Sequence, residues 1–282
     1  MMLRDALFAR LRGTRAPQPD TAKFRWRGAG VSRIEGLSDA VFGFAITLLV
    51  VSLEVPSTSG ELLGAMRGFL SFALTFFVLF AVWRTQFTFF RRYGLEDDTT
   101  ITLTGVLLFV VMFSIYPIKF LLTALIDRVV WGVRAAPGGT TVLGTAIERE
   151  HWPWVLIIYG VGFGAVALVF ALLHRHAYAQ RAELELTDLE TLDTRNAMMR
   201  WFTATSMSVL VPLIGIVSFI PDDSPVAEPA IYTTLALSLV SAVVMLRYRL
   251  RVQRRRREFI AALAAKSDNP QETAQLIDQA DW

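Results

Sequence analysis

The chain alternates between long apolar blocks and short polar connections. Six blocks are visible, each of about twenty residues, which is the length that an α-helix needs to cross a hydrocarbon core of about 30 Å. They cover residues 36–55, 62–83, 100–121, 153–174, 202–220 and 230–248. The pattern predicts an all-α membrane protein with six transmembrane helices and argues against a soluble enzyme.

Charges in the connections predict the orientation. The first connection has no Lys or Arg before Arg67, and the fifth, between 220 and 230, has none. The second and fourth connections carry arginines, as does the start of the tail: Arg84, Arg91, Arg92, Arg175, Arg181, Arg195, Arg200, Arg247, Arg249 and Arg251. Because cytoplasmic loops are enriched in Lys and Arg, both termini are expected in the cytoplasm. In the mixed third connection, 122–152, the Val129–Val133 segment is a candidate surface helix.

Three segments follow from this pattern. Residues 1–32 form a basic cytoplasmic N-terminal arm, expected to be partly disordered and to rest on anionic headgroups. Residues 33–250 form the transmembrane domain, and 251–282 a cytoplasmic basic and helical tail. Segment 181–195 is predicted to be a short amphipathic helix or an extension lying against the bundle.

Composition narrows the chemistry. The chain has 282 residues and no cysteine, which removes disulfides, thiolate metal sites and a cysteine nucleophile. We expect no cofactor, no metal site and no nucleic-acid partner, because the basic clusters report membrane topology. His151, His174 and His176 are interpreted as ordinary residues at span ends. Glycines 160, 162 and 164 favour close helix contact, and Pro212 and Gly215 mark a weak point within the fifth span.

The first span, Arg33 to Pro56, carries most of the functional information. Wound as an α-helix at about 100° per residue, it gathers one set of side chains within about 40° of a single line. The set is Arg33, Leu37, Ala40, Phe44, Leu48, Val51 and Val55, with Thr47 just beside it. This apolar face is either a lipid-facing or packed surface, or a pore lining in which bulky apolar rings gate by dewetting.

Asp39 lies in this span on the side opposite to that face, together with Glu35. A carboxylate within a membrane helix needs a partner or a wet cavity. We expect a buried polar cluster of Ser38 and Asp39 with Arg84, Gln86 or a neighbouring chain's Arg33. The favoured interpretation is a polar clamp that fixes helix packing, and the other is an ion-binding role for Asp39.

The opening of the first span resembles a known signature. Arg33-x-x-x-Leu37-Ser38-Asp39 is similar to the Arg-x-x-x-Phe-Ser-Asp motif of the transmembrane protein 175 family of potassium channels. Residues 45–50, Trp83 at the end of the second span, and Phe113-Ser114-Ile115-Tyr116-Pro117 in the third occupy similar contexts. The resemblance covers approximately residues 33–248 and is most specific in 33–53.

The resemblance implies a homotetramer of six-helix subunits in the bacterial inner (cell) membrane, in contact with lipid, with a central pore lined by the first helix of each subunit. Potassium is then the permeant ion. The family's narrowest ring falls on Phe44, its threonine on Thr47, and further apolar rings on Leu48 and Val51. The structural signature network falls on Arg33, Leu37, Ser38, Asp39, Trp83, Arg84 and Gln86.

The chain departs from the family pattern at three places. Leu37 replaces a phenylalanine, Phe44 replaces the isoleucine of the narrowest ring, and Arg84-Thr85-Gln86 replaces an Asn-His-His pattern after Trp83. The alternative function is a secondary transporter or proton-linked carrier that uses Asp39. A third is a non-conducting scaffold or sensor acting through the cytoplasmic helix.

Overall fold

A computed structural model describes most of the chain before residue 218. The described residues are 25–28, 30–51, 56–130, 141–142, 147–148 and 151–217, together with residues 247, 250, 251, 254 and 258. The sixth predicted span, 230–248, and nearly all of the predicted tail therefore lie outside the described residues. So do residues 1–24 of the predicted arm and most of the Val129–Val133 segment.

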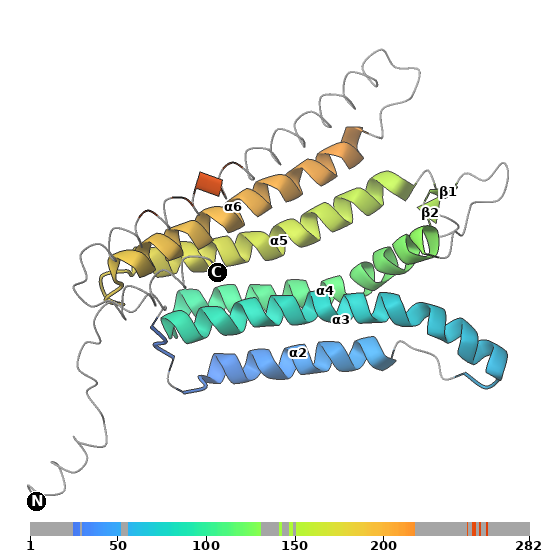
Figure 1. Cartoon of the computed structure of the whole chain (residues 1–282), viewed down its shortest axis with the longest axis horizontal. Helices are drawn as coiled ribbons and strands as arrows, with labels where there is room; N and C mark the ends of the chain where they lie inside the picture. The colour runs from blue at the N-terminus through green and yellow to red at the C-terminus, as the bar shows by residue number, and fades with distance from the viewer. Residues whose placement is uncertain are drawn as a thin grey trace, which may run out of the picture.

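Five long helices make up the described part of the chain. They are α2 (Arg33–Val51), α3 (Ser59–Tyr93), α4 (Asp98–Val129), α5 (Trp152–Ala179) and α6 (Asp188–Val217). In Figure 1 they run side by side along the long axis, with α2 next to α3 and α4 and with α6 next to α5. The third connection contains two short antiparallel strands, β1 (Thr141–Val142) and β2 (Ile147–Glu148), which the all-α prediction did not include.

Four of the described helical stretches are long and apolar enough to cross a membrane. They are Arg33–Val51, Gly68–Tyr93, Asp98–Ile126 and Pro153–Ala179. The helical character predicted for the first four spans is therefore confirmed. The fifth predicted span lies mainly within α6, a helix whose first turn carries Asp188 and Glu190.

The helices are longer than the apolar blocks that predicted them. Helix α3 continues from the predicted end at 83 to Tyr93, where Gly94 adopts a left-handed conformation (φ 61°) and closes the helix. The side chain of Asp97 then accepts a hydrogen bond from the amide of Thr99 and begins α4. Arg84 and Arg91 consequently lie on a helix and not in a loop, because hydropathy marks where a helix enters polar surroundings and not where it ends.

Segment 181–195 is divided between two elements. Residues 181–185 form a turn after α5, and α6 begins at Asp188, so the amphipathic leucines beyond that point belong to the first turns of α6. The prediction of a separate short helix is therefore wrong, whereas the alternative prediction, an extension lying against the bundle, agrees with the structure.

Helices α5 and α6 make the closest contact in the bundle. A Cβ atom added at Gly160 of α5 would lie 2.1 Å from Cδ of Pro212 in α6. At Gly215 of α6 it would lie 2.6 Å from the carbonyl oxygen of Pro153 in α5. The predicted role of the glycines in close helix contact is thus confirmed at Gly160. Pro212, expected to be a weak point, instead packs against a glycine.

Candidate functional site

Helix α2 begins with a reciprocal cap. The hydroxyl of Ser32 accepts from the amide of Glu35 at 3.2 Å, and a carboxylate oxygen of Glu35 accepts from the amide of Ser32 at 3.0 Å. This capping box satisfies amides that a helix start leaves without a partner. It fixes the first turn, and hence the rotation of every side chain that follows on α2.

One side of α2 packs within the chain. Ser38, Phe42, Ala45 and Leu49 are buried, and the three apolar members belong to the hydrophobic core shared with α3, α4 and α5. Phe42 is 2% exposed. This side lies against α3 and α4, which leaves the opposite side of α2 without a covering helix among the described residues.

The uncovered side of α2 is what we call the exposed arc: Leu37, Ala40, Phe44, Thr47 and Val51. Phe44 is 56% exposed and Val51 is 71% exposed. The hydroxyl of Thr47 donates to the carbonyl oxygen of Gly43 at 3.0 Å, and its oxygen, on an exposed residue, can still accept. Leu48, predicted to share this face, is half-buried and marks the edge of the arc.

The signature residues separate into two contacts with α3. Nε2 of Gln86 donates to the hydroxyl of Ser38 at 2.9 Å in a buried position. Nε1 of Trp83 donates to a carboxylate oxygen of Asp39 at 2.7 Å. The structure therefore brings Ser38, Asp39, Trp83 and Gln86 together, as the clamp interpretation requires.

Two details of the predicted clamp are wrong within the single chain. Asp39 is exposed and not buried, because it sits at the margin of the packed side, where the Trp83 ring only partly covers it. Arg84 has an exposed side chain and forms no ion pair with Asp39 among the described residues. The alternative partner, Arg33 of a neighbouring chain, stays a prediction. The partner of the carboxylate is the indole ring of Trp83.

Aromatic side chains extend this contact along α3. The ring of Trp83 stacks on Phe87 at a centroid distance of 5.5 Å and lies 5.4 Å from the ring of Phe80. Phe80 in turn stacks on Phe76 at 6.2 Å. The spacing of three or four residues places all four rings on one side of the helix. The indole that holds Asp39 is thus fixed by neighbours on both sides.

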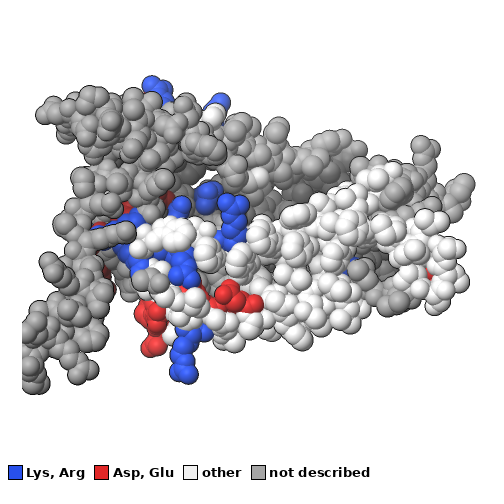
Figure 2. Space-filling model, turned by 60° about the horizontal axis from the view of Figure 1, so that its bottom comes forward, with Lys and Arg blue, Asp and Glu red and all other residues white. Residues whose placement is uncertain are grey.

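The end of the bundle at which α2 begins is rich in charged residues, and we call it the basic end. Figure 2 shows charged side chains gathered toward one end of the visible face and an uncharged surface along most of the rest. Arg27, expected in a partly disordered arm, is folded into this end and forms an ion pair of 2.6 Å with Glu190 of α6. The sequence signal that was missed is Thr187-Asp188-Leu189-Glu190, the Ser/Thr-x-x-Glu pattern of a helix start.

Two carboxylates at the basic end have shifted acidities. Burial raises the pKa of Glu190, but hydrogen bonds from Arg27 and from the amides of Arg25 and Thr187 outweigh it, so the pKa lies below its ordinary value. Partial burial also raises the pKa of Asp97, but hydrogen bonds from Thr100 and His176 bring it below its ordinary value. Both groups are therefore held as carboxylates.

The histidines do not form a metal site in the described part of the chain, where no group of three His, Cys, Asp or Glu side chains is placed to hold an ion. His174 is 5% exposed, and its Nδ1 lies 2.8 Å from the carbonyl oxygen of Phe170. Its placement at the span end as an ordinary interfacial residue is therefore wrong. His176 contacts Asp97 at 2.7 Å, which ties the end of α5 to the start of α4.

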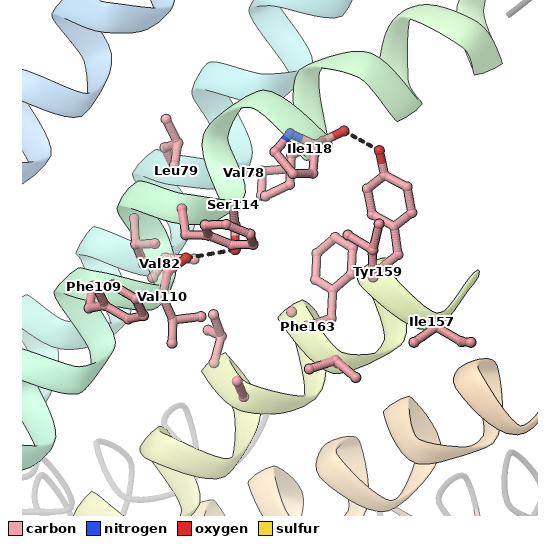
Figure 3. A pocket seen from close by; sticks show the side chains of 18 residues that line it. Val78, Leu79, Val82, Phe109, Val110, Ser114, Ile118, Ile157, Tyr159 and Phe163 are labelled. Atoms are coloured by element: carbon pink, nitrogen blue, oxygen red, sulfur yellow. Dashed lines mark hydrogen bonds between the residues drawn. The ribbon is translucent and has the colours of Figure 1, made fainter. Parts of the chain in front are cut away.

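A pocket of about 380 Å³ lies between α3, α4 and α5, and none of its lining residues belongs to α2. Figure 3 shows Val78, Phe109, Phe163 and other apolar side chains around it. Its two hydroxyl groups are already used, since Ser114 donates to the carbonyl of Val110 and Tyr159 to that of Pro117. The other lining side chains are apolar, so this pocket is a weaker candidate for an ion site than the exposed arc.

Comparison with known proteins gives concordant similarities. The family model described as endosomal/lysosomal potassium channel TMEM175 matches residues 33–114. A potassium channel of Marivirga tractuosa is 34% identical over 200 residues, which cover 69% of this chain and 76% of the relative. A potassium channel of Chamaesiphon minutus is 27% identical over 192 residues, covering 63% of this chain and 84% of the relative.

One solved structure is also similar. It is a crystal structure of a variant of the potassium channel MtTMEM175 in complex with a nanobody–MBP fusion protein. The TM-score is 0.66 at 28% sequence identity, and the match covers 84% of this chain and 98% of that chain. The similarity therefore extends well beyond the first three helices.

Proposed function

The chain belongs to the TMEM175 family of potassium channels, it is a multi-pass membrane protein and no enzyme, and we propose that it forms a potassium-permeable cation pore in the bacterial inner (cell) membrane. The proposed assembly is a homotetramer surrounded by lipid, in which four copies of α2 turn their exposed arcs toward a common axis. Potassium is the permeant ion, and no cofactor takes part.

The observation that carries this proposal is the exposed arc of α2. Lipid could cover an apolar helix side, but this one carries the Thr47 hydroxyl among apolar side chains. A purely lipid-facing side gains nothing from a hydroxyl, since polar groups in hydrocarbon are costly. Four copies facing an axis would place the four Thr47 hydroxyls toward the inside of an assembly.

The proposed mechanism is hydrophobic gating. Rings of Phe44, Leu48 and Val51 form a narrow apolar constriction from which water leaves readily, so the pore conducts only when it widens enough to stay wet. Hydroxyl oxygens at Thr47, between these rings, replace part of the hydration shell of a passing ion. Because the structure turns Leu48 partly toward its own chain, we assign the main constriction to Phe44 and Val51 and a lesser part to Leu48.

Asp39 has a supporting role in this proposal. Its bond to Trp83, together with the bond from Gln86 to Ser38, fixes the rotation of α2 and hence the direction of the exposed arc. Arg33, Leu37 and Arg84 are exposed in the single chain, which fits residues that contact a neighbouring subunit in the assembly.

Potassium flux in liposomes tests the pore. The purified chain is reconstituted, a potassium gradient is imposed, and the flux is compared among the unchanged protein, Phe44→Ala, Thr47→Ala and Phe109→Ala. Phe109 lies on α4 and is 73% exposed, so it is a matched control for a change of exposed phenylalanine. We expect a higher flux with Phe44→Ala, a lower potassium preference with Thr47→Ala, and no change with Phe109→Ala.

The carrier alternative gives a different result in the same liposomes. A proton-linked carrier would require a proton gradient and would lose transport in Asp39→Asn. In a passive channel, flux follows the potassium gradient alone, and Asp39→Asn acts by loosening the helix. Flux that is insensitive to both Phe44→Ala and Thr47→Ala would overturn the pore assignment.

A further inference from the structure

The segment just before α2 is held by a buried ion pair. Arg27, six residues upstream of the helix start, has a side chain that is 11% exposed, and its partner Glu190 is 5% exposed at the side chain. The guanidinium group of Arg27 reaches both carboxylate oxygens of Glu190, at 3.1 and 2.6 Å. Its Nε also donates to the carbonyl of Leu184 at 2.8 Å. A planar fork used this fully is specific to arginine.

A second arginine holds the same segment from α3. The amides of Arg27 and Gly28 both donate to the carbonyl of Arg91, at 3.0 and 3.3 Å. The side chain of Arg91 donates to the carbonyl of Gly28 at 2.9 Å and lies 3.6 Å from a carboxylate oxygen of Glu35. Glu35 is the residue that closes the capping box of α2. The last turn of α3 is thus joined directly to the first turn of α2.

Together these groups connect three helix ends. Glu190 belongs to the first turn of α6, where its carboxylate also accepts from the amide of Thr187 at 3.1 Å. The segment that leads into α2 is therefore bound both to the end of α3 and to the start of α6. Since α6 packs on α5, a displacement of the α5–α6 pair reaches α2 through these contacts.

We propose that Arg27, Glu35, Arg91 and Glu190 form a latch that positions α2 and keeps the constriction narrow. This inference rests on the proposed pore. The latch residues are positioning residues, since they lie at the helix entry and not on the exposed arc. Releasing the latch lets α2 shift, and a small widening is enough to wet an apolar constriction.

The latch is tested with Arg27→Gln/Glu190→Gln. Removing both charges avoids the unpaired buried charge that either single change would leave, so the double variant is the one expected to fold. Arg27→Lys is the second variant, because it keeps the charge and loses the fork. The matched control is Arg25→Gln/Glu185→Gln, which removes an exposed pair between the segment before α2 and the turn before α6, 57% and 82% exposed at the side chains. The Arg25 contact with Glu190 is made by its backbone amide and survives this change.

Two readouts separate positioning from mere stability. The first is potassium flux per folded channel after size-exclusion purification. The second is the rate at which a water-soluble thiosulfonate reagent modifies Thr47→Cys, which is the only thiol because the chain has no cysteine. We expect both to rise on the order of fivefold or more in Arg27→Gln/Glu190→Gln, to rise less in Arg27→Lys, and to stay unchanged in the control.

The outcomes distinguish this inference from the pore proposal. If the unchanged protein conducts and responds to Phe44→Ala, but the latch variants keep its flux and its Thr47→Cys modification rate, the latch is refuted and the pore stands. A lower flux with an unchanged modification rate also refutes the latch. If the unchanged protein does not conduct, the pore proposal fails first. If the rate of Thr47→Cys modification still rises in Arg27→Gln/Glu190→Gln, the latch does position α2, and only its link to conduction is refuted.

Discussion

The α5–α6 pair and helix α2 differ in how closely they pack within one chain. In the pair, each helix places a glycine against a proline residue of the other, so their facing sides approach to backbone distance, although the outer sides remain exposed, as at Val161 and Ile216. Helix α2 is packed on one side and uncovered on the other, although both sides are apolar. Apolarity alone therefore does not decide what a helix contacts in a membrane protein. The uncovered side of α2 is where a partner or a function should be sought.

The largest loss of stability is expected from a substitution at the α5–α6 contact. In Gly160→Ala the new methyl group would lie 2.1 Å from Cδ of Pro212, so α5 and α6 must separate. Overpacking of this kind costs about 1–3 kcal/mol, and we expect a value near the upper end because a proline ring cannot rotate away. Gly162→Ala is the control, since its methyl group would meet the Ser114 hydroxyl at an ordinary 3.6 Å.

Thermal unfolding in detergent measures this difference. Gly162→Ala should be neutral or slightly stabilising, because alanine is the better helix former. Equal melting temperatures for the two variants would show that the α5–α6 contact yields easily, and the comparison with α2 would lose its basis.

A smaller effect is expected on the packed side of α2. Phe42→Ala leaves a cavity in the core, where Phe42 is 2% exposed, and should cost about 2 kcal/mol. The cost is below that of a soluble core, because lipid is as apolar as the protein interior and only the lost packing counts. Phe44→Ala, two residues away on the exposed arc, should leave the unfolding of the chain nearly unchanged. A similar loss in both would mean that the arc is covered within the chain.

The polar contact of the packed side should contribute less again. Ser38→Ala removes the acceptor of Gln86, whose other amide atom, Oε1, has no hydrogen-bond partner among the described residues. Interhelical hydrogen bonds in membranes contribute about 0.6–1.7 kcal/mol, and we expect about 1 kcal/mol here. Ser38→Ala combined with Gln86→Leu should recover part of the loss, because no buried amide is then left unpaired. A double variant that is less stable than Ser38→Ala would contradict this account.

Acid should weaken the basic end while leaving the exposed arc unaffected. The pKa of Glu190 lies below the ordinary glutamate value of 4.5, so its contribution to stability is fully present above that pH. It is lost as the pH falls through the lowered pKa, when the carboxylate that binds Arg27 takes up a proton. Arg27→Gln/Glu190→Gln, which has no carboxylate to protonate at this position and leaves no unpaired arginine, should show a flatter decline of melting temperature below pH 4.5 than the unchanged protein. Parallel declines in the two proteins would remove Glu190 from the explanation.

The sequence was sufficient where a local period decides the structure. The position of α2, its apolar side around Phe44 and the contact role of Gly160 all follow from spacing and side-chain size. Helix ends were missed because hydropathy falls at Trp83, whereas backbone hydrogen bonding continues to Tyr93. The buried ion pair of Arg27 could not be predicted from composition, because arginine is the common residue both of a basic arm and of such a pair.

The clamp shows the same limit at finer scale. Ser38 and Gln86 were expected to meet, and they do. The expected partners of Asp39 were Arg84, Gln86 or a neighbouring chain's Arg33, and within the chain the indole of Trp83 takes that place. Which side chain meets Asp39 depends on the directions of side chains at the α2–α3 contact. The candidates on α3 lie within one helical turn of each other, so sequence spacing alone cannot distinguish them.

The reciprocal glycine–proline contacts of α5 and α6 also bear on how this protein can be recombined with its relatives. Gly160 faces the ring of Pro212, and Gly215 faces the carbonyl oxygen of Pro153, so the two helices fit in one register. Sliding either helix by a turn would place a side chain against the Pro212 ring or the Pro153 carbonyl. A chimera that exchanges one of these helices alone would break the fit, whereas exchanging both together would preserve it. We therefore expect α5 and α6 to be exchangeable only together. The four residues of the contact, Gly160, Pro212, Gly215 and Pro153, can be used to search for the same helix pair in more distant chains.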